Sequence, residues 1–451
     1  MMKQTEEVKQ AFEQRMDHTE LMNCMRCGFC LPSCPTYVET GDNEAASPRG
    51  RIALMKGVVD GLIEPDEEVE KQLNLCLGCR ACEPVCPSGV QYGHLLEEAR
   101  DILEQHKQRP LHERALRRVV FHWLFPNHKR IRQTVSLLYL YQKTGLKTWV
   151  QKMKINQWLP KHLDEMQSIL PNVPSPAEMK HRPAFLGAKQ PVRKRVAFFS
   201  GCLMDTLFMS TNDATLTLLQ LAGCEVVIPK TQGCCGALHG HSGEKEKAKE
   251  LAKRNIAAFE SLDVDAIVTN AGGCGAFLTE YQNLFQDEPK WRKRAEQFTG
   301  KIKDFSEILV ECGFHKAVPL SMPEQMVTYQ ESCHLRNVMR ISQAPRLLLE
   351  SIDHVNVQEL PENQYCCGSA GIYNIVQPEL SMKILDRKMK QVQSLQPSLM
   401  VTANPGCLLQ MRLGVKQAGL ECDIRVEHLA DVLLESVPQE MKNHGRGGEN
   451  G

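Results

Sequence analysis

The C-terminal two thirds of the chain alternate short apolar runs with stretches of helical periodicity. Residues 215–223 and 344–352 carry apolar side chains at helical spacing. Runs of β-branched and aromatic residues predict strands at 196–200, 224–229, 266–270, 327–330, 355–360 and 399–403. Strands that alternate with helices indicate parallel α/β sheets, in which ligands gather at the carboxyl ends of the strands.

This order of elements occurs twice, and cysteines mark the same places in both copies. Each copy has one cysteine after its first strand, an adjacent pair followed by glycine, and one after its third strand. The ends of the copies, 301–311 and 425–435, also agree. We therefore predict a duplicated domain of about 120 residues whose four thiols converge on one pocket. The matched residues lie 131 to 133 positions apart: Cys202 with Cys333, Cys234 with Cys366, Cys235 with Cys367, and Cys274 with Cys407.

The N-terminal part of the chain has helical patterns only. Ser47 and Pro48 open one predicted helix, and the run from Gly61 to Pro65 separates it from a second helix that ends before the next cysteines. A charged amphipathic helix follows from Tyr92 to about His106. We therefore expect this domain to be helical.

Two cysteine runs of the form C-x2-C-x2-C-x3-C-P frame these helices, at residues 24–35 and 76–87. In such a run three thiols surround one [4Fe-4S] cluster, while the fourth, before its proline, turns to another cluster. Structural zinc sites or a disulfide knot are the alternatives, but zinc needs neither the third equally spaced cysteine nor the distal Cys-Pro. Two runs therefore predict two clusters that exchange ligands. We assign Cys24, Cys27, Cys30 and Cys86 to the first cluster, and Cys76, Cys79, Cys82 and Cys34 to the second.

Composition narrows the class of protein. Lys and Arg balance Asp and Glu at 54 each in 451 residues, so the global charge does not indicate nucleic-acid binding. The N-terminus has no apolar signal segment, and no run of about 18 apolar residues occurs, so we expect a cytoplasmic protein. In that reducing compartment the 19 cysteines are expected to be metal ligands rather than disulfides. The sequence shows no dinucleotide-binding motif, P-loop or flavin site.

Residues 111–154 form a basic segment with ten Lys and Arg against one acid, interleaved with aromatic and aliphatic side chains. Basic amphipathic helices with aromatic residues are typical of contact with a membrane surface, here the inner face of the cell membrane. The alternative is a linker that packs on the next domain and keeps a solvated basic rim. A second linker is expected at 171–191, which is rich in proline and small residues.

These motifs resemble two known kinds of domain. The N-terminal part is similar to the helical two-cluster ferredoxin domain of iron-sulfur subunits in flavin-linked dehydrogenases. The repeated part resembles the cysteine-rich CCG domain of heterodisulfide reductase subunits and related dehydrogenases, whose pattern ends in CxxC. Both copies lack the first cysteine of that element, since Ala271 and Asn404 stand there. The four thiolates left in each copy could hold a further iron-sulfur cluster or, in one copy, zinc. The resemblance thus makes metal ligands of Cys202, Cys234, Cys235, Cys274, Cys333, Cys366, Cys367 and Cys407.

Over nearly its whole length the chain resembles the family of glycolate oxidase iron-sulfur subunits. The resemblance implies an α+β protein: a helical ferredoxin domain with two [4Fe-4S] clusters, then two tandem α/β CCG domains. It also implies that an FAD-containing partner oxidises glycolate to glyoxylate and that this chain passes the electrons toward a quinone. No substrate oxidation is expected from the chain alone. The alternatives are the iron-sulfur subunit of anaerobic glycerol-3-phosphate dehydrogenase, or a disulfide-cleaving subunit similar to heterodisulfide reductase.

The expected boundaries follow from these patterns. The ferredoxin domain spans 1–110, the basic segment and linker 111–190, the two CCG domains 191–320 and 321–440, and a disordered tail 441–451. Three cysteines outside the motifs, Cys224, Cys312 and Cys422, are expected to be buried apolar side chains. His334, beside Cys333, is expected to be a hydrogen-bonded histidine at a helix start.

Overall fold

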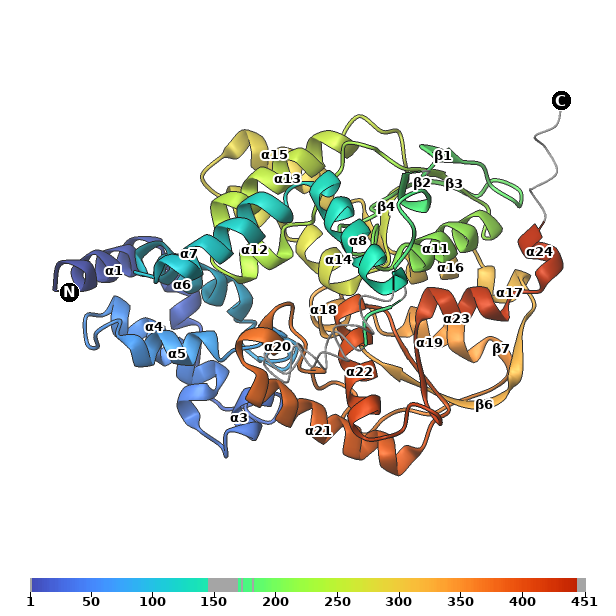
Figure 1. The fold of residues 1–451 in the computed structure, drawn as a ribbon. Helices are drawn as coiled ribbons and strands as arrows, with labels where there is room; N and C mark the ends of the chain where they lie inside the picture. The colour runs from blue at the N-terminus through green and yellow to red at the C-terminus, as the bar shows by residue number, and fades with distance from the viewer. Residues whose placement is uncertain (1, 145–168, 172, 181, 444–451) are drawn as a thin grey trace.

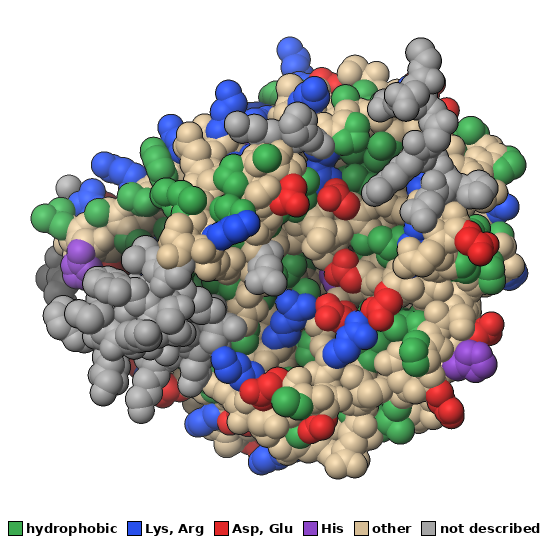
Figure 2. Space-filling model, turned by 45° about the vertical axis from the view of Figure 1, so that its right-hand side comes forward, with side chains coloured by type: hydrophobic (Ala, Val, Ile, Leu, Met, Phe, Trp, Pro, Cys, Tyr) green, Lys and Arg blue, Asp and Glu red, His purple; other side chains and the backbone are tan. Residues whose placement is uncertain are grey.

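The computed structural model describes residues 2–144, 169–171, 173–180 and 182–443. A helical N-terminal domain lies at one end of the molecule, and two α/β units lie side by side beyond it (Figure 1). Acidic and basic side chains are interspersed on the face that Figure 2 shows. Among the described residues, no helix combines the length and apolar character needed to cross a bilayer.

The N-terminal domain is helical, as its sequence pattern predicts. Ser47 caps the fourth helix by accepting a hydrogen bond from the Gly50 N–H, and Asp66 caps the fifth in the same way. Phe12, Met55 and Leu73 lie in its core with no exposed surface. The helices are α1 (Met2–Arg15), α2 (His18–Met22), α3 (Pro35–Glu39), η1 (Glu44–Ala46), α4 (Pro48–Val59), α5 (Glu67–Asn74) and α6 (Tyr92–His106).

The basic segment leaves this domain and packs on the first α/β unit. It forms α7 (Leu111–Arg117), the π-helix η2 (Arg118–Leu124) and α8 (His128–Lys143). Ile131 and Val135 are buried in the core of that unit. The described part of the segment therefore packs as the linker alternative expects, while its residues 145–154 lie outside the described residues. The short turn η4 (Glu178–Lys180) follows.

The first α/β unit contains a five-stranded sheet in the order β1-β3-β2-β4-β5. The strands are β1 (Phe185–Leu186), β2 (Lys194–Phe198), β3 (Cys224–Val227), β4 (Ala266–Thr269) and β5 (Ile302–Asp304). The pairings of β2 with β3 and β4, and of β4 with β5, are parallel, whereas β1 pairs antiparallel with β3. The helices are α11 (Met209–Leu221), α12 (Ala237–His241), α13 (Lys245–Phe259), α14 (Gly272–Leu278), η5 (Tyr281–Phe285), α15 (Pro289–Thr299), α16 (Phe305–Glu311) and α17 (Phe314–Ala317).

The second unit repeats this design with four parallel strands in the order β7-β6-β8-β9. The strands are β6 (Leu320–Gln330), β7 (Ile352–Val357), β8 (Leu399–Thr402) and β9 (Arg425–His428). The helices are α18 (Cys333–Asn337), α19 (Gln343–Glu350), α20 (Tyr373–Val376), α21 (Pro378–Leu395), α22 (Pro405–Gln417), α23 (Leu429–Ser436) and α24 (Gln439–Asn443). The two units share one hydrophobic core, to which Val196 and Val268 of the first and Val327 and Val401 of the second contribute.

The predicted parallel α/β architecture is confirmed, with differences in detail. The strand predicted at 355–360 lies at 352–357, and residues 441–443, expected in a disordered tail, belong to α24. The edge strand β1 begins before the boundary expected at 191, and it is antiparallel because it follows a linker rather than a crossover helix. The strand predicted at 327–330 begins seven residues earlier, at Leu320. The repeat ends that matched in sequence, 301–311 and 425–435, each prove to be a short strand followed by a helix.

Candidate metal centres

The first cysteine quartet surrounds a cavity in the N-terminal domain. The cavity has a volume of about 430 Å³, and its wall contains Cys24, Cys27, Cys30 and Cys86. Cys86 comes from the second loop, so the structure brings together the four residues that the exchange of distal cysteines predicts. Burial raises the pKa of Cys30 to about 11, so this thiol needs a nearby cation to ionise.

The second quartet is more deeply buried. Burial raises the pKa of Cys79, with a further contribution from the nearby Cys333, and burial also raises the pKa of Cys82, whose neighbours include Cys79, Cys76 and Cys34. Burial favours the neutral form of Cys76 as well, but the charges of Arg51 and Arg100 outweigh it and lower the pKa of that thiol. These four cysteines are therefore neighbours, as the assignment of the second cluster predicts.

Arg51 is a fully buried cation beside this second quartet. Its Nε donates to the Gln72 carbonyl at 2.6 Å, and its Nη2 donates to Thr36 Oγ1 at 3.0 Å, which in turn lies 3.2 Å from the sulfur of Cys34. Its Nη1 is buried without a hydrogen-bond partner among the described atoms. A buried guanidinium with an unsatisfied donor suits an anionic group held by the neighbouring thiolates.

Left-handed backbone turns explain how both loops curl around their quartets. Gly28 and Gly78 have φ of 87° and 67°, and Arg26 and Arg80 each have φ of 57°. Each loop thus holds one glycine and one arginine in the left-handed region, at exchanged positions. The arginines adopt a conformation that glycine adopts without strain; the Arg80 side chain is held by ion pairs described below, whereas the Arg26 side chain is exposed.

In the first α/β unit four thiols meet at the carboxyl end of the sheet. The thiol of Cys234 interacts with those of Cys202 and Cys235, and the thiol of Cys235 interacts in turn with Cys274. The contact with Cys234, and then burial, raise the pKa of Cys202 well above its ordinary value. The expected convergence of the four cysteines is therefore seen in the fold.

The second unit repeats the arrangement. The thiol of Cys366 interacts with Cys333 and Cys367, and that of Cys367 interacts with Cys407. In both copies the glycine after the paired cysteines is left-handed, with φ of 88° at Gly236 and 90° at Gly368. A side chain at Gly368 would also meet the Ser381 carbonyl oxygen at 2.8 Å. The CCG motif therefore needs its glycine for both conformation and space.

Asn404 occupies the place where related domains have a further cysteine. Its Nδ2 donates to the sulfur of Cys407 at 3.5 Å, while its Oδ1 accepts from the Gly273 N–H at 3.0 Å. Gly273 precedes Cys274 of the first unit. One amide side chain thus links the thiol of one copy to the backbone beside a thiol of the other copy.

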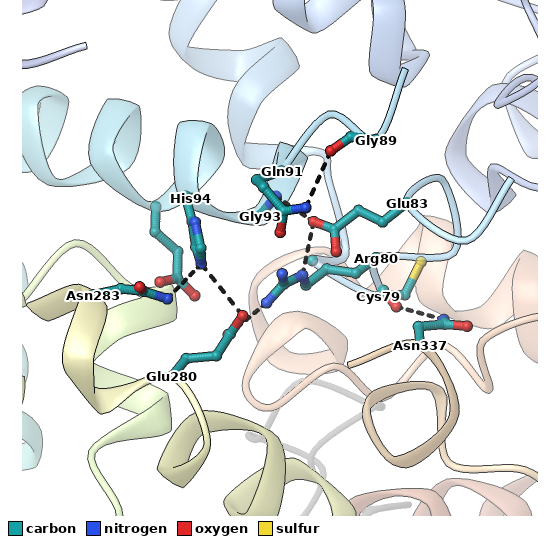
Figure 3. A network of polar contacts seen from close by, with 12 residues as sticks. Cys79, Arg80, Glu83, Gly89, Gln91, Gly93, His94, Glu280, Asn283 and Asn337 are labelled. Atoms are coloured by element: carbon teal, nitrogen blue, oxygen red, sulfur yellow. Dashed lines mark hydrogen bonds and ion pairs between the residues drawn. The ribbon is translucent and has the colours of Figure 1, made fainter. Parts of the chain in front are cut away.

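The N-terminal domain contacts the second unit at the second quartet. Cys79 shares a hydrophobic core with Cys333, Cys366, Cys367 and Cys407. The side chain of Asn337, at the end of α18, donates to the Cys79 carbonyl at 2.9 Å (Figure 3). Cys274 of the first unit packs partly buried against the same core. The four quartets therefore lie in series, from the first loop quartet through the second to those of the two α/β units.

A buried ion network fixes this arrangement to the first unit. Arg80 Nε donates to Glu83 at 2.9 Å, and its Nη1 donates to Glu280 on the first unit at 2.5 Å (Figure 3). His94 lies 3.3 Å from the same Glu280 carboxylate. Burial opposes ionisation of Glu280, but the hydrogen bond from His94 and the charge of Arg80 lower its pKa to about 2. The left-handed Arg80 is thus held by carboxylates of two domains.

The quartets fit iron-sulfur clusters by their donor chemistry. Their thiols are grouped and mostly buried, and an inorganic core of iron supplies the positive charge that ionises such thiols. Within the described residues, no three His, Cys, Asp or Glu side chains are arranged around a single ion. A cluster holds its thiolates farther apart than one ion does, because iron and sulfide lie between them. The assignment of individual ligands stays a prediction.

Several residues near the quartets were missed from the sequence. Arg51, Arg80, Asn337 and Lys388 are polar, yet each lies buried beside a cysteine or a cysteine loop. No local pattern distinguishes them from surface residues of the same helices, because their partners are remote in the chain. For Lys388 alone, the internal repeat could have indicated a special position, because it aligns this lysine with the uncharged Asn255 of the first unit.

Two expectations are corrected by the structure. Cys224 and Cys312 are buried as expected, with their sulfurs 3.8 Å apart, but Cys422 is exposed because it lies in the turn between α22 and β9. His334 is not fully hydrogen-bonded: its Nδ1 lies 3.4 Å from the sulfur of Cys333, and its Nε2 is buried without a partner in the described structure. Burial lowers the pKa of His334 to about 3, so the ring is neutral.

Fold and cysteine geometry together define an iron-sulfur protein that joins a dicluster domain to a duplicated cysteine-rich domain. Family models match accordingly: a 4Fe-4S dicluster domain at residues 20–90, the linker region of the glycolate oxidase iron-sulfur subunit at 112–170, and a cysteine-rich domain at 196–279 and 327–412. The chain is 62% identical over 435 residues to a probable glycolate oxidase iron-sulfur subunit of Bacillus subtilis, covering 96% of this chain and 98% of that protein. The chain belongs to the family of glycolate oxidase iron-sulfur subunits.

Two further relatives frame this assignment. The glycolate oxidase iron-sulfur subunit of Escherichia coli is 33% identical and matches 89% of this chain and 92% of its own length. Lactate utilization protein A of an Exiguobacterium species is 35% identical over 244 residues, which is 54% of this chain and 98% of that protein. The linker model at residues 112–170 covers nearly all of the basic segment.

Proposed function

We propose that this chain is the electron-transfer component of a complex in which an FAD-containing partner oxidises glycolate to glyoxylate. Electrons leave the flavin singly, pass through the cysteine quartets and continue toward a quinone at the membrane. The names of its relatives support such a complex, and the lack of a recognisable flavin-binding motif in the sequence is consistent with oxidation on another subunit. The chain itself then holds no catalytic residue.

The observation that carries the proposal is the serial placement of the four quartets. The wall of the first cavity contains Cys82 of the second quartet in addition to its own four cysteines. The second quartet reaches the second α/β unit at Cys79 and Cys333, and Asn404 joins that unit to the first. Iron-sulfur clusters bound there supply one-electron acceptors. The cysteines of the second quartet and of the two α/β units are buried, apart from the half-buried Cys274, so clusters there would lie in low-dielectric surroundings.

The grouping of the cysteines supports the ligand sets that the sequence predicts. We assign Cys24, Cys27, Cys30 and Cys86 to one [4Fe-4S] cluster and Cys34, Cys76, Cys79 and Cys82 to a second. The four cysteines of each α/β unit would hold a further cluster. Arg51 donates toward the second quartet, and Asn404 donates to Cys407, so both would stabilise sulfur ligands that carry negative charge.

The basic segment would bring the complex to the membrane surface. Trp123, Leu137 and Leu140 are 48%, 68% and 50% exposed, although they are large and apolar. The Arg130 guanidinium lies over the Trp123 ring, 4.9 Å from its centre, and Lys129 beside it is exposed. Such a surface binds anionic lipid through apolar contact and charge. Flotation with vesicles of phosphatidylglycerol should therefore carry the complex at low salt and lose it at high salt, whereas phosphatidylcholine vesicles should not carry it.

The test of the function is co-purification followed by electron transfer. The anaerobically purified chain should bring down a flavoprotein whose flavin glycolate reduces. Cys27→Ser or Cys79→Ser should abolish glycolate-dependent reduction of a soluble quinone, while a dye that accepts electrons from the flavin is still reduced. Equal loss of both activities would show a structural role and contradict the relay.

Iron analysis separates the alternatives. Four clusters correspond to about sixteen irons per chain, and two clusters with zinc in the α/β units to about eight. Glycerol 3-phosphate in place of glycolate as the reductant of the co-purified flavoprotein would favour the related dehydrogenase. A disulfide-cleaving subunit is disfavoured, because Ala271 and Asn404 stand where the further cysteine of that class would lie.

A further inference from the structure

The side chain of Lys388 ends in a buried ammonium group that makes one hydrogen bond and no ion pair among the described residues. It lies on α21 and is 2% exposed, and its Nζ donates to the Glu362 carbonyl at 3.1 Å. Among the described residues, no carboxylate lies within ion-pair distance of it. The nearest acids are engaged elsewhere: Glu362 pairs with Arg387 at 2.8 Å, and Glu331 pairs with Arg346 at 2.7 Å. A buried cation in this position calls for another source of negative charge.

The sulfurs of the second α/β unit would supply that charge as thiolate ligands of a cluster. Lys388 and Cys366 both line a small cavity of about 230 Å³ between α21 and α3. Burial lowers the pKa of Lys388 to about 8, and Cys367 and then Cys366 oppose that shift. Lys388 therefore lies beside the first of the paired cysteines of this unit, in the wall of a cavity that both residues line.

The internal repeat shows what stands at this place in the other copy. Cys274 and Cys407 are 133 positions apart, and the same offset aligns Lys388 with Asn255. The three-dimensional structure supports this alignment. Gly236 lies against Ala248 in the first unit, and Gly368 lies against Ser381 in the second. Ala248 and Ser381 are again 133 positions apart.

Asn255 is neutral and fully satisfied. Its Nδ2 donates to the Cys234 carbonyl at 2.9 Å, and its Oδ1 accepts from the Gly233 N–H at 2.8 Å. The first unit thus braces its paired cysteines with an amide, whereas the second places a cation beside them. Of the described residues, the cationic side chains counted as buried are Arg51, Arg80 and Lys388, and none of these belongs to the first unit.

We infer that Lys388 sets the reduction potential of the centre in the second unit above that of the centre in the first. The inference rests on the proposed function, in which both quartets hold clusters. Adding one electron to a centre breaks no bond and adds one negative charge, and a nearby cation in a low-dielectric interior stabilises that charge. The second unit, which adjoins the ferredoxin quartets, would then be filled before the first.

The test is a redox titration of the cluster-loaded full chain, followed by electron paramagnetic resonance. Lys388→Gln should shift the midpoint of one component to a more negative potential and leave the other midpoints unchanged. That component should be the one whose signal is lost in Cys407→Ser. Lys390→Gln removes the same charge from an exposed position of the same helix and should leave every midpoint in place.

A charge-conserving variant separates electrostatics from packing. Lys388→Arg should keep the wild-type midpoint, and Lys388→Met should reproduce the shift of Lys388→Gln. Unchanged midpoints in Lys388→Gln, or an equal shift in Lys388→Arg, would overturn the inference. A wild-type protein with about eight irons and zinc in the α/β units would remove its premise, and the metal content alone identifies that outcome.

Discussion

The two α/β units share one design but differ in what surrounds their cysteines. Both bring four thiols to the carboxyl end of a parallel sheet and use a left-handed glycine after the paired cysteines. The second unit faces the ferredoxin loops through Cys333 and carries the buried Lys388. Beside the quartet of the first unit, the hydroxyl of Tyr281 donates to the Cys235 carbonyl at 2.7 Å, and the buried Asp205 pairs with Arg132 and Arg182. Duplication thus supplied two similar sites, and their neighbours assign them different places in the relay.

The largest effect is expected when the cysteine quartet of each α/β unit is disrupted in turn. Cys366→Ser should leave the ferredoxin clusters reducible by glycolate through the flavoprotein, but it should abolish reduction of the centre in the first unit. Cys234→Ser should leave the centre of the second unit reducible. Resonance spectra of the complexes frozen soon after mixing with glycolate measure both. Equal reduction of the first unit in the two variants would show that electrons reach it without passing through the second.

The sequence predicted more of each unit than of the contacts between them. The repeat offset located the eight cysteines of the two α/β units, because thiols at strand ends are fixed by local order along the chain. The contact of Cys79 with Cys333 could not be predicted, since it joins surfaces whose residues are more than 250 positions apart. The burial of Arg80 could not be predicted either, because its partner Glu280 lies 200 positions away in the chain. Local patterns specify elements, whereas the order of the quartets depends on how three domains pack.

The units also differ at the residue that caps the helix directly after their last strand. Asp304 caps α16 in the first unit and His428 caps α23 in the second. Burial raises the pKa of Asp304 to about 7, and burial lowers the pKa of His428 to about 4. Between about pH 4 and 7, Asp304 is therefore protonated in the folded chain and ionised in the unfolded chain. Between about pH 4 and 6.5, His428 is neutral in the folded chain and protonated in the unfolded chain.

These two groups should give opposite pH dependences. Asp304 lowers the free energy of unfolding as pH rises from about 4 to about 7, and His428 lowers it as pH falls from about 6.5 to about 4, each on the order of 3 kcal/mol. Urea unfolding across this pH range measures the free energy of unfolding. Asp304→Asn should remove the decrease in that free energy toward pH 7, and His428→Asn should remove the decrease toward pH 4. A pair of variants with the same pH profile as the wild type would contradict both assignments.

The smallest expected effect concerns matched residues four positions after the first cysteine of each unit. Asn337 reaches across to the Cys79 carbonyl at 2.9 Å, whereas Thr206 donates to the Cys202 carbonyl of its own unit at 3.0 Å. Asn337→Ala should destabilise the docking of the ferredoxin domain on the second α/β unit by about 1–3 kcal/mol. It should also slow electron transfer between the second ferredoxin quartet and the quartet of the second α/β unit. Thr206→Val removes a hydrogen bond of the same class and should leave that transfer unchanged. Rapid-mixing spectroscopy at equal iron content measures the rates, and equal slowing in both variants would show that the loss reflects general destabilisation rather than the junction at Cys79.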